Sequence, residues 1–365
     1  HGTNRRQRQM CIRDSFFYRP FEYFLPLENT NIKLISIMQL SFDTLIRLLS
    51  KLVVLATLLL IFVGALIKSH EVGLSVPDWP TSYGKQMFSF PLSEMVGGIF
   101  FEHGHRLFAT IVGFLTLVLA IIVGFSNQPK WVKQISLLAL VLVISQGLLG
   151  GMTVLYFLPP PISILHGILA QTFFAVTIFI AYSQSKIRSR KQKSLSAPYV
   201  RRGAIILASL VYIQLILGAL MRHTGSGLAI PDFPTMGGLW FPSFSESMVN
   251  NINVDLFDMN LDMVNKWQIF IHFAHRLGAM VIFSFYCIFL FKFVKDDNRK
   301  PLESKMIIII SAFILLQIAL GIATVMTERL PYIASFHVVV GAALLGSCVL
   351  LVFISQSNKL EELRF

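Results

Sequence analysis

The chain has 365 residues, of which 55% are hydrophobic and only 14% are charged, and its mean hydropathy is +0.67. This composition excludes a disordered chain, a coiled coil and a secreted soluble protein, because long uncharged stretches require an apolar solvent. The formal net charge of +12 does not indicate nucleic-acid binding, since the Lys and Arg residues lie mainly in short segments between apolar runs.

Residues 1–37 differ in composition from the rest of the chain. Four arginines within the first 13 residues precede a short aromatic patch at residues 16–24. From Met38 onward the pattern is that of a bacterial membrane-protein start, with Arg47 and Lys51 ahead of a long apolar run. We therefore expect residues 1–37 to be an upstream or non-native segment outside the functional protein.

Eight apolar runs follow, each long enough to cross about 30 Å of hydrocarbon at about 1.5 Å per helical residue. A backbone in lipid must satisfy its own polar groups, so each run is interpreted as a helix. The fold class is therefore all-α, a polytopic membrane protein with eight transmembrane helices. The predicted spans are 52–68, 99–125, 135–156, 162–184, 203–221, 268–291, 306–327 and 332–355.

Basic residues fall mainly in alternate connections between these spans. The connections after the second, fourth and sixth spans carry 14 Lys and Arg residues, against 5 in the remaining ones. By the positive-inside rule both termini are cytoplasmic, and segments 69–98 and 222–267 lie outside. The predicted location is the bacterial cytoplasmic membrane, with the lipid bilayer as solvent.

The two halves of the chain share an internal repeat. The segment from Gly73 to Thr81 reappears in similar form from Gly227 to Thr235, offset by 154 residues. A His-Arg-Leu triplet recurs at an offset of 170, and further matches recur at 171. Since each half has an even number of spans, the sequence predicts two four-helix bundles related as a parallel repeat, with a second outer loop 16 residues longer.

The chain divides accordingly. Residues 38–184 form the first unit and residues 203–355 form the second unit. A polar, basic linker at 185–202 joins them on the cytoplasmic side, and residues 356–365 form a cytoplasmic tail.

Four histidines occupy matching places in the repeat, His105 and His166 in the first unit and His275 and His337 in the second. Each lies roughly four to seven residues into a span entered from outside, about 6–10 Å below the boundary. An ionisable side chain inside a span is costly and indicates function. Two imidazoles facing each other in a bundle suit the axial positions of a haem iron. The alternatives are interhelical hydrogen bonds, or zinc, for which two imidazoles are too few ligands.

Glu102 distinguishes the first unit, because the repeat places His272 at the corresponding position. Glu102 lies three residues before His105 and so on the same helix face, where a carboxylate could act as a base beside a haem edge. The alternative is a helix N-terminal glutamate favoured by the macrodipole. Arg106 and Arg276 are candidate partners of haem propionates, with snorkelling to lipid headgroups as the alternative.

Together these features resemble the heme A synthase family of cytochrome oxidase assembly proteins, over about residues 45–355. The resemblance rests on Gly-Leu-Ser-x-Pro-Asp-Trp-Pro after the first span, Glu-x-x-His-Arg at the second, and single histidines on spans four, six and eight. It implies oxidation of a methyl group of haem O to the formyl group of haem A. It also implies roles for the site residues: catalysis by Glu102, substrate haem binding by His105 and His166, and binding of a haem b cofactor by His275 and His337.

The chain departs from the family pattern in its first outer loop. Residues 69–98 contain no cysteine, whereas some bacterial members have a cysteine pair there, so a thiol-based step is not supported. Candidate partners are haem O synthase, cytochrome c oxidase assembly factors and a second copy of the chain. The rival functions are a di-haem b-type electron carrier, which would place its haems at different depths, and a haem exporter, which would not require Glu102.

Overall fold

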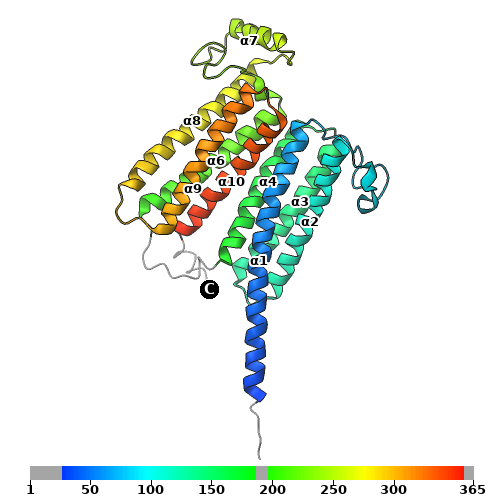
Figure 1. Ribbon diagram of the computed structural model, residues 1–365, viewed down its shortest axis with the longest axis vertical. Helices are drawn as coiled ribbons and strands as arrows, with labels where there is room; N and C mark the ends of the chain where they lie inside the picture. Colours follow the sequence, from blue (N-terminus) through cyan, green and yellow to red (C-terminus); the bar gives the residue numbers. More distant parts are fainter. Residues whose placement is uncertain (1–26, 186–195, 357–365) are drawn as a thin grey trace, which may run out of the picture. The chain divides into compact units, whose positions relative to one another are not determined.

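The computed structural model describes residues 27–185 and 196–356, with side chains described from Phe42 onward (Figure 1). The predicted upstream segment, linker and tail therefore lie largely outside the described residues. The contacts divide the chain into a segment His1–Ser41 and a body Phe42–Phe365. Everything that positions the site lies in the body.

The described residues are helical and contain no extended strand. Eight helices are long and apolar enough to cross a membrane, which confirms the predicted all-α, multi-pass fold. Their arrangement as two repeated bundles stays a prediction. The eight are α1 (Leu27–Ser69), α2 (Gly98–Phe125), α3 (Lys130–Leu155), α4 (Pro160–Ser183), α6 (Pro198–His223), α8 (Lys266–Val294), α9 (Pro301–Met326) and α10 (Pro331–Ser355).

Several helices begin earlier than the apolar runs predict. The helix α6 starts at Pro198, where the prediction had linker as far as residue 202, and α9 starts at Pro301. Proline suits the first helical turn for two reasons. Its fixed φ matches the helix, and the N–H that it lacks would have no acceptor within the helix at that position. The start of α6 was missed because Arg201 and Arg202 are charged, and the prediction counted only the apolar residues that follow them.

Two apolar clusters hold the helices together. One cluster joins the four helices α1, α2, α3 and α4 and includes Ile46 and Leu119, which are almost completely buried. The other joins α6, α8, α9 and α10 around Leu207 and Leu345. A smaller cluster that includes Ala342 packs α4 against α10. The buried apolar area stabilises the helix packing, and the polar groups Glu102, Arg106, His272 and Arg276 lie at one end of the helices.

That end carries the two loop segments 70–97 and 224–265 and is called the loop-bearing end. The first loop contains two short 3-10 turns, η1 (Met87–Ser89) and η2 (Leu92–Glu94), and the second contains a third, η3 (Ser226–Leu228).

The longer second loop folds into an additional helix, α7 (Glu246–Asp258), drawn beyond the end of α8 in Figure 1. The hydroxyl of Ser245 caps α7 by accepting a hydrogen bond from the backbone N–H of Met248. Met248, Ile252 and Leu256 recur every four residues and form its buried face. They pack with residues of the 229–236 turn in an apolar cluster, so the additional residues of this loop build a small core of their own.

Candidate functional site

One large cavity brings the predicted site residues together. Its volume is about 2130 Å³, and all eight long helices contribute to its lining. The four histidines and Glu102 all line it. Pockets for drug-sized ligands measure about 300–1,000 Å³, so this cavity has room for two macrocycles.

The second-unit histidines face each other across the cavity. The ring centroids of His275 and His337 are 6.4 Å apart, with an angle of 67° between the ring planes. An imidazole nitrogen binds a metal ion at about 2 Å, which places the centroids of two rings on opposite sides of one metal roughly 6 Å apart. In the first unit, His105 and His166 line the same cavity.

Each histidine ring packs on a glycine of a neighbouring helix. A Cβ atom added to any of these glycines would lie only 3.1 to 3.3 Å from the Cε1 atom of the ring, so even a methyl group would displace the imidazole. The glycines are themselves related by the repeat, at offsets of 154 and 171. The pairs are Gly64 with His105, Gly150 with His166, Gly218 with His275 and Gly321 with His337.

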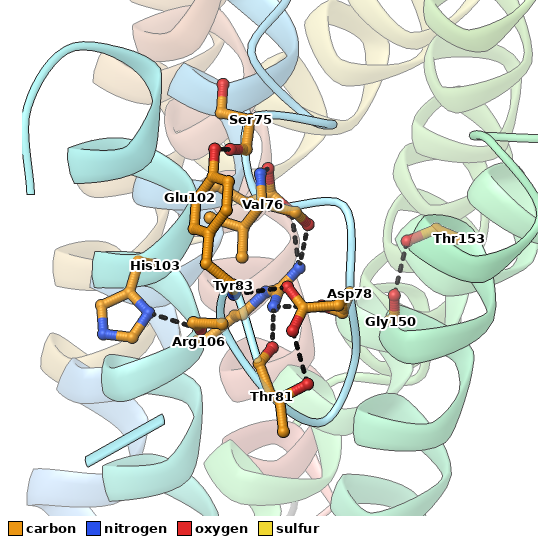
Figure 2. A network of polar contacts seen from close by, with 11 residues as sticks. Ser75, Val76, Asp78, Thr81, Tyr83, Glu102, His103, Arg106, Gly150 and Thr153 are labelled. Atoms are coloured by element: carbon orange, nitrogen blue, oxygen red, sulfur yellow. Dashed lines mark hydrogen bonds and ion pairs between the residues drawn. The ribbon is translucent and has the colours of Figure 1, made fainter. Parts of the chain in front are cut away.

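A carboxylate network ties the first loop to α2 (Figure 2). Glu102 is 4% exposed, and its two oxygens accept hydrogen bonds from the backbone N–H of Val76 at 2.9 Å and from Nη2 of Arg106 at 2.8 Å. The guanidinium group of Arg106 also donates to the carbonyls of Val76, Asp78 and Thr81 at 2.7 to 3.0 Å. Glu102 and Arg106 are therefore fixed by the loop that covers them.

The second unit repeats this network with an imidazole in place of the carboxylate. Arg276 donates to the carbonyls of Ile230, Asp232 and Thr235 at 2.8 to 3.1 Å. His272 lies 3.2 Å from the backbone nitrogen of Ile230 through Nδ1 and 3.1 Å from Nε of Arg276 through Nε2. A neutral imidazole has a single acceptor nitrogen, so only one of these contacts is a hydrogen bond in a given tautomer.

The aspartate of each Pro-Asp-x-Pro segment closes a turn. Asp78 accepts hydrogen bonds from the backbone of Tyr83 and Gly84, and Asp232 accepts from Gly237 and Gly238, at 2.7 to 3.0 Å. Burial acts to raise the pKa of each carboxyl group, but the hydrogen bonds outweigh it and lower both pKa values below the ordinary one. These segments thus form the predicted turns.

A second polar contact supports the first loop and was not anticipated from the sequence. His103 is fully buried, and its Nδ1 lies 2.9 Å from the hydroxyl of Ser82. The repeat places Met236 and Phe273 at these positions, and both belong to the apolar cluster around α7. A comparison of the two repeats would have shown this difference, because two polar residues in the first unit correspond to two apolar residues in the second.

Trp79 also reaches the cavity. Its indole lies so close to Gly151 of α3 that an added Cβ would come within 2.5 Å of the ring, and both residues line the cavity. The tryptophan of the first loop therefore packs directly on the helix that also carries Gly150.

The cations around the cavity are more numerous than the sequence suggested. Arg106 and Arg276 make most of their contacts with loop carbonyls, so their role toward propionates stays a prediction. Lys68, Arg222 and Arg329 also line the cavity, and Arg222 donates to the carbonyl of Ala65 on α1 at 2.6 Å.

The donor set fits haem. The Nδ1 atoms of His105, His166 and His337 are buried, and the described residues offer them no hydrogen-bond partner. These nitrogens are closed off by protein atoms, but the imidazoles themselves line a large, mainly apolar cavity, and imidazole is a suitable ligand for the iron of an enclosed macrocycle. Within residues 42–185 and 196–356, no group of three or more His, Cys, Asp or Glu side chains could hold a metal ion, which argues against zinc.

Known proteins resemble this chain over most of its length. The sequence pattern of the cytochrome oxidase assembly protein family matches residues 47–349. The chain belongs to this family. Similar proteins include the heme A synthase of Halalkalibacterium halodurans, 26% identical over 306 residues that cover 81% of this chain and 92% of the relative. Those of Rickettsia prowazekii and Shewanella oneidensis are 25% and 24% identical, covering 82% and 77% of this chain and 95% and 88% of the relatives.

The family match contains every predicted site residue. It includes α2 to α9 in full, both loops, Glu102 and the four histidines. Membership of the cytochrome oxidase assembly family confirms the resemblance found in the sequence.

Proposed function

We propose that the protein is a heme A synthase, an oxidoreductase that converts a methyl group of haem O to the formyl group of haem A for cytochrome c oxidase biogenesis. Family membership and the names of the relatives support this function. The observation that carries it is one cavity lined by two pairs of partly buried histidines. Only the first pair has a carboxylate, Glu102, at the repeat position where the second has His272.

The two pairs differ in their proposed roles. His105 and His166 hold the substrate haem O, and His275 and His337 hold a haem b cofactor by its iron. When bound, the cofactor supplies one-electron redox chemistry. The histidines of the first unit fix the position of the substrate, so that one methyl group comes to lie beside Glu102.

Glu102 is the proposed proton acceptor. Its oxygens accept hydrogen bonds from Val76 and Arg106, and because a carboxylate has about four acceptor sites it can still accept a proton. These two bonds orient the carboxylate before the reaction begins. Trp79, packed on Gly151, lines the same cavity. Arg106 and Arg276 remain candidate partners for the propionates.

Replacing Glu102 by Gln tests this function. The variant keeps the shape of the side chain but removes its basicity, so haem A formation should fall at least about 100-fold in a strain that makes haem O. Haem bound to the purified protein should be unchanged, as measured by pigment extraction. Full haem A formation in the Glu102→Gln protein would eliminate the catalytic role.

The matched control is Glu94→Gln. Glu94 lies in the same loop and pairs with Lys85 at 2.8 Å, but both side chains are about half exposed. Its replacement should leave haem A formation unchanged, because an exposed ion pair contributes little to stability.

The rival function, a di-haem electron carrier, is not favoured. All four histidines lie six to nine residues after the first residue of a helix that starts at the loop-bearing end. The two haems would therefore lie at similar depths rather than on a path across the membrane.

A further inference from the structure

A small groove lies at the end of the helices opposite to the loop-bearing end, between the last turns of α8 and the first turn of α6. Its volume is about 470 Å³. The groove is lined by Tyr199, Ile288, Phe291, Lys292, Lys295 and Asp296. It is separate from the cavity described above, because the two share no lining residue.

Four positions of α8 in this groove share one face of the helix. They are spaced by three or four residues, from Ile288 through Phe291 and Lys292 to Lys295. Ile288 and Phe291 are 71% and 63% exposed. Both lie in the last two turns of a helix that is long and apolar enough to cross a membrane, so their exposed surface faces hydrocarbon. Each lysine therefore follows an apolar, lipid-facing side chain by one turn.

Aromatic rings hold the two lysines at the groove. The Nζ atom of Lys292 lies 5.0 Å from the ring centroid of Tyr199, and that of Lys295 lies 4.2 Å from the ring centroid of Phe291. In the described part of the chain, neither ammonium group forms an ion pair with a carboxylate. A cation over an aromatic face keeps its full charge. The groove therefore combines two uncompensated positive charges with an apolar wall.

The other wall of the groove is fixed by hydrogen bonds. The hydroxyl of Tyr199 donates to a carboxylate oxygen of Asp296 at 2.7 Å, and the backbone N–H of Asn298 donates to the other oxygen at 2.9 Å. The ring of Tyr199 packs edge-on against Phe289, with the ring centroids 6.5 Å apart. The acidic side chain in the groove is thus bound to Tyr199 and Asn298 rather than to the lysines.

The first unit has no such pair of cations. At the offset of 170 that relates His105 to His275, the places of Lys292 and Lys295 are taken by Ile122 and Phe125 near the end of α2. The end of a membrane-spanning helix in this fold therefore does not require a lysine at either position. The two charges are particular to the second unit, which favours a specific role for them over general snorkelling to the membrane surface.

We propose that this groove binds an anionic phospholipid. The phosphate lies between the ammonium groups of Lys292 and Lys295, and the beginning of an acyl chain lies along Ile288 and Phe291. Basic pockets between membrane-spanning helices are suited to phospholipid headgroups. A free phosphate ion would use the two lysines but would leave the apolar wall uncovered. The proposal does not depend on the proposed function, because the groove is separate from the histidine cavity.

The test is a lipid titration of the purified protein, freed of lipid and followed by native mass spectrometry. The unmodified protein should bind its first dioleoyl phosphatidylglycerol at least about tenfold more tightly than its first dioleoyl phosphatidylcholine. In the double variant Lys292→Gln, Lys295→Gln, affinity for phosphatidylglycerol should fall at least about tenfold. Affinity for phosphatidylcholine should stay within about twofold. The variant Lys292→Arg, Lys295→Arg keeps both charges and should keep the preference.

The matched control is Lys130→Gln, Lys133→Gln. These lysines are also three residues apart, and they lie in the first turn of α3 at the same end of the helices, outside the groove. The control removes the same charge as the test variant, so it measures general attraction to anionic lipid. Its affinity for phosphatidylglycerol should stay within about twofold of that of the unmodified protein. Equal losses in the two glutamine variants, or no preference in the unmodified protein, would overturn the lipid groove.

Thermal unfolding in detergent separates the two sources of phosphate. Phosphatidylglycerol should raise the midpoint of unfolding of the unmodified protein, and inorganic phosphate at the same concentration should not, because it cannot cover Ile288 and Phe291. The rise should be lost in Lys292→Gln, Lys295→Gln and retained in the Lys130 and Lys133 control. If inorganic phosphate raises the midpoint as much as the lipid, and only when Lys292 and Lys295 are present, the groove is a phosphate site and the proposal of a lipid is wrong.

Discussion

The loop-bearing ends of the two units have the same arrangement of hydrogen bonds around an arginine. They differ in one central residue, which is Glu102 in the first unit and His272 in the second. In both, an arginine on the second helix of the unit holds three carbonyls of a Pro-Asp-x-Pro turn. The carboxylate of Glu102 accepts hydrogen bonds from both neighbours, whereas the neutral imidazole of His272 can accept only one. The repeated arrangement thus holds a carboxylate in one unit and an imidazole in the other.

The residues around these two arginine networks also differ between the units. In the first unit, His103 and Ser82 make a polar contact below the loop, and a Cβ at Gly113 or Gly147 would meet no heavy atom within 4 Å. In the second unit, apolar side chains and α7 fill the region that corresponds to His103 and Ser82. The two units therefore differ in polarity and in side-chain volume around a similar set of loop contacts.

The largest expected effect separates the two histidine pairs. Replacing His275 or His337 with Ala should lower the content of resident haem, because one of the two imidazoles that would hold its iron is lost. Replacing His105 or His166 should leave that haem in place and abolish binding of added porphyrin. The measurements are pigment content after purification and porphyrin titration, with His103→Phe as the control that copies the second unit. Loss of the resident haem in all four variants would contradict the division of roles.

The two arginines should differ in their contribution to stability. Arg106→Ala leaves the buried Glu102 without its charge partner and should cost about 3–5 kcal/mol of unfolding free energy. Arg276→Ala leaves only neutral hydrogen-bond partners, the loop carbonyls and His272, unsatisfied and should cost about 1–3 kcal/mol. Thermal unfolding in detergent measures both. Adding Glu102→Gln to Arg106→Ala should recover part of the loss, and equal losses in the two single variants would show that the Glu102 charge is unimportant.

The glycines beneath the histidines should behave alike in the two units. Gly150→Ala and Gly321→Ala each push a methyl group against an imidazole and should cost about 1–3 kcal/mol by overpacking. The displaced ring should also alter the absorption spectrum of the bound haem. Gly104→Ala is the control, because a Cβ there meets no heavy atom within 4 Å and Ala274 occupies the corresponding place. Unchanged spectra would mean that the glycines do not position the rings.

The smallest effect concerns the two turn aspartates. Because the pKa values of Asp78 and Asp232 in the folded protein lie below the ordinary value of 3.8, their contribution to stability is complete above that pH and is lost as the pH falls through the lower values. The effect is less than about 1 kcal/mol per residue, since both groups are substantially exposed to solvent screening. Asp78→Asn and Asp232→Asn should flatten the fall in thermal stability as the pH drops below about 4. A stability that rises on acidification would contradict the assignment.

Much of the site could be predicted because the repeat is visible in the sequence. The offsets placed His105, His166, His275 and His337 together, and they singled out Glu102 because its counterpart is a histidine. The contacts of the histidines with glycines could not be predicted in this way. Each contact joins residues of two different helices, so the spacing of residues along the chain does not indicate which glycine packs on which ring.

The same limit applies to the arginines and the second loop. The sequence suggested propionates as partners of Arg106, whereas the fold places loop carbonyls within reach of its guanidinium group. The apolar face of α7 is short and interrupted by polar residues, so the helix is evident only from its packing against the 229–236 turn.

The sequence by itself determined the number of spans, the repeat and the identity of the iron-binding candidates, because hydrophobic length, charge placement and internal similarity are properties of the linear chain. Only the tertiary structure decided which groups hold Glu102 and which glycines set the positions of the imidazoles. Those features depend on distances between helices, and such distances arise from the packing of side chains that lie far apart along the chain.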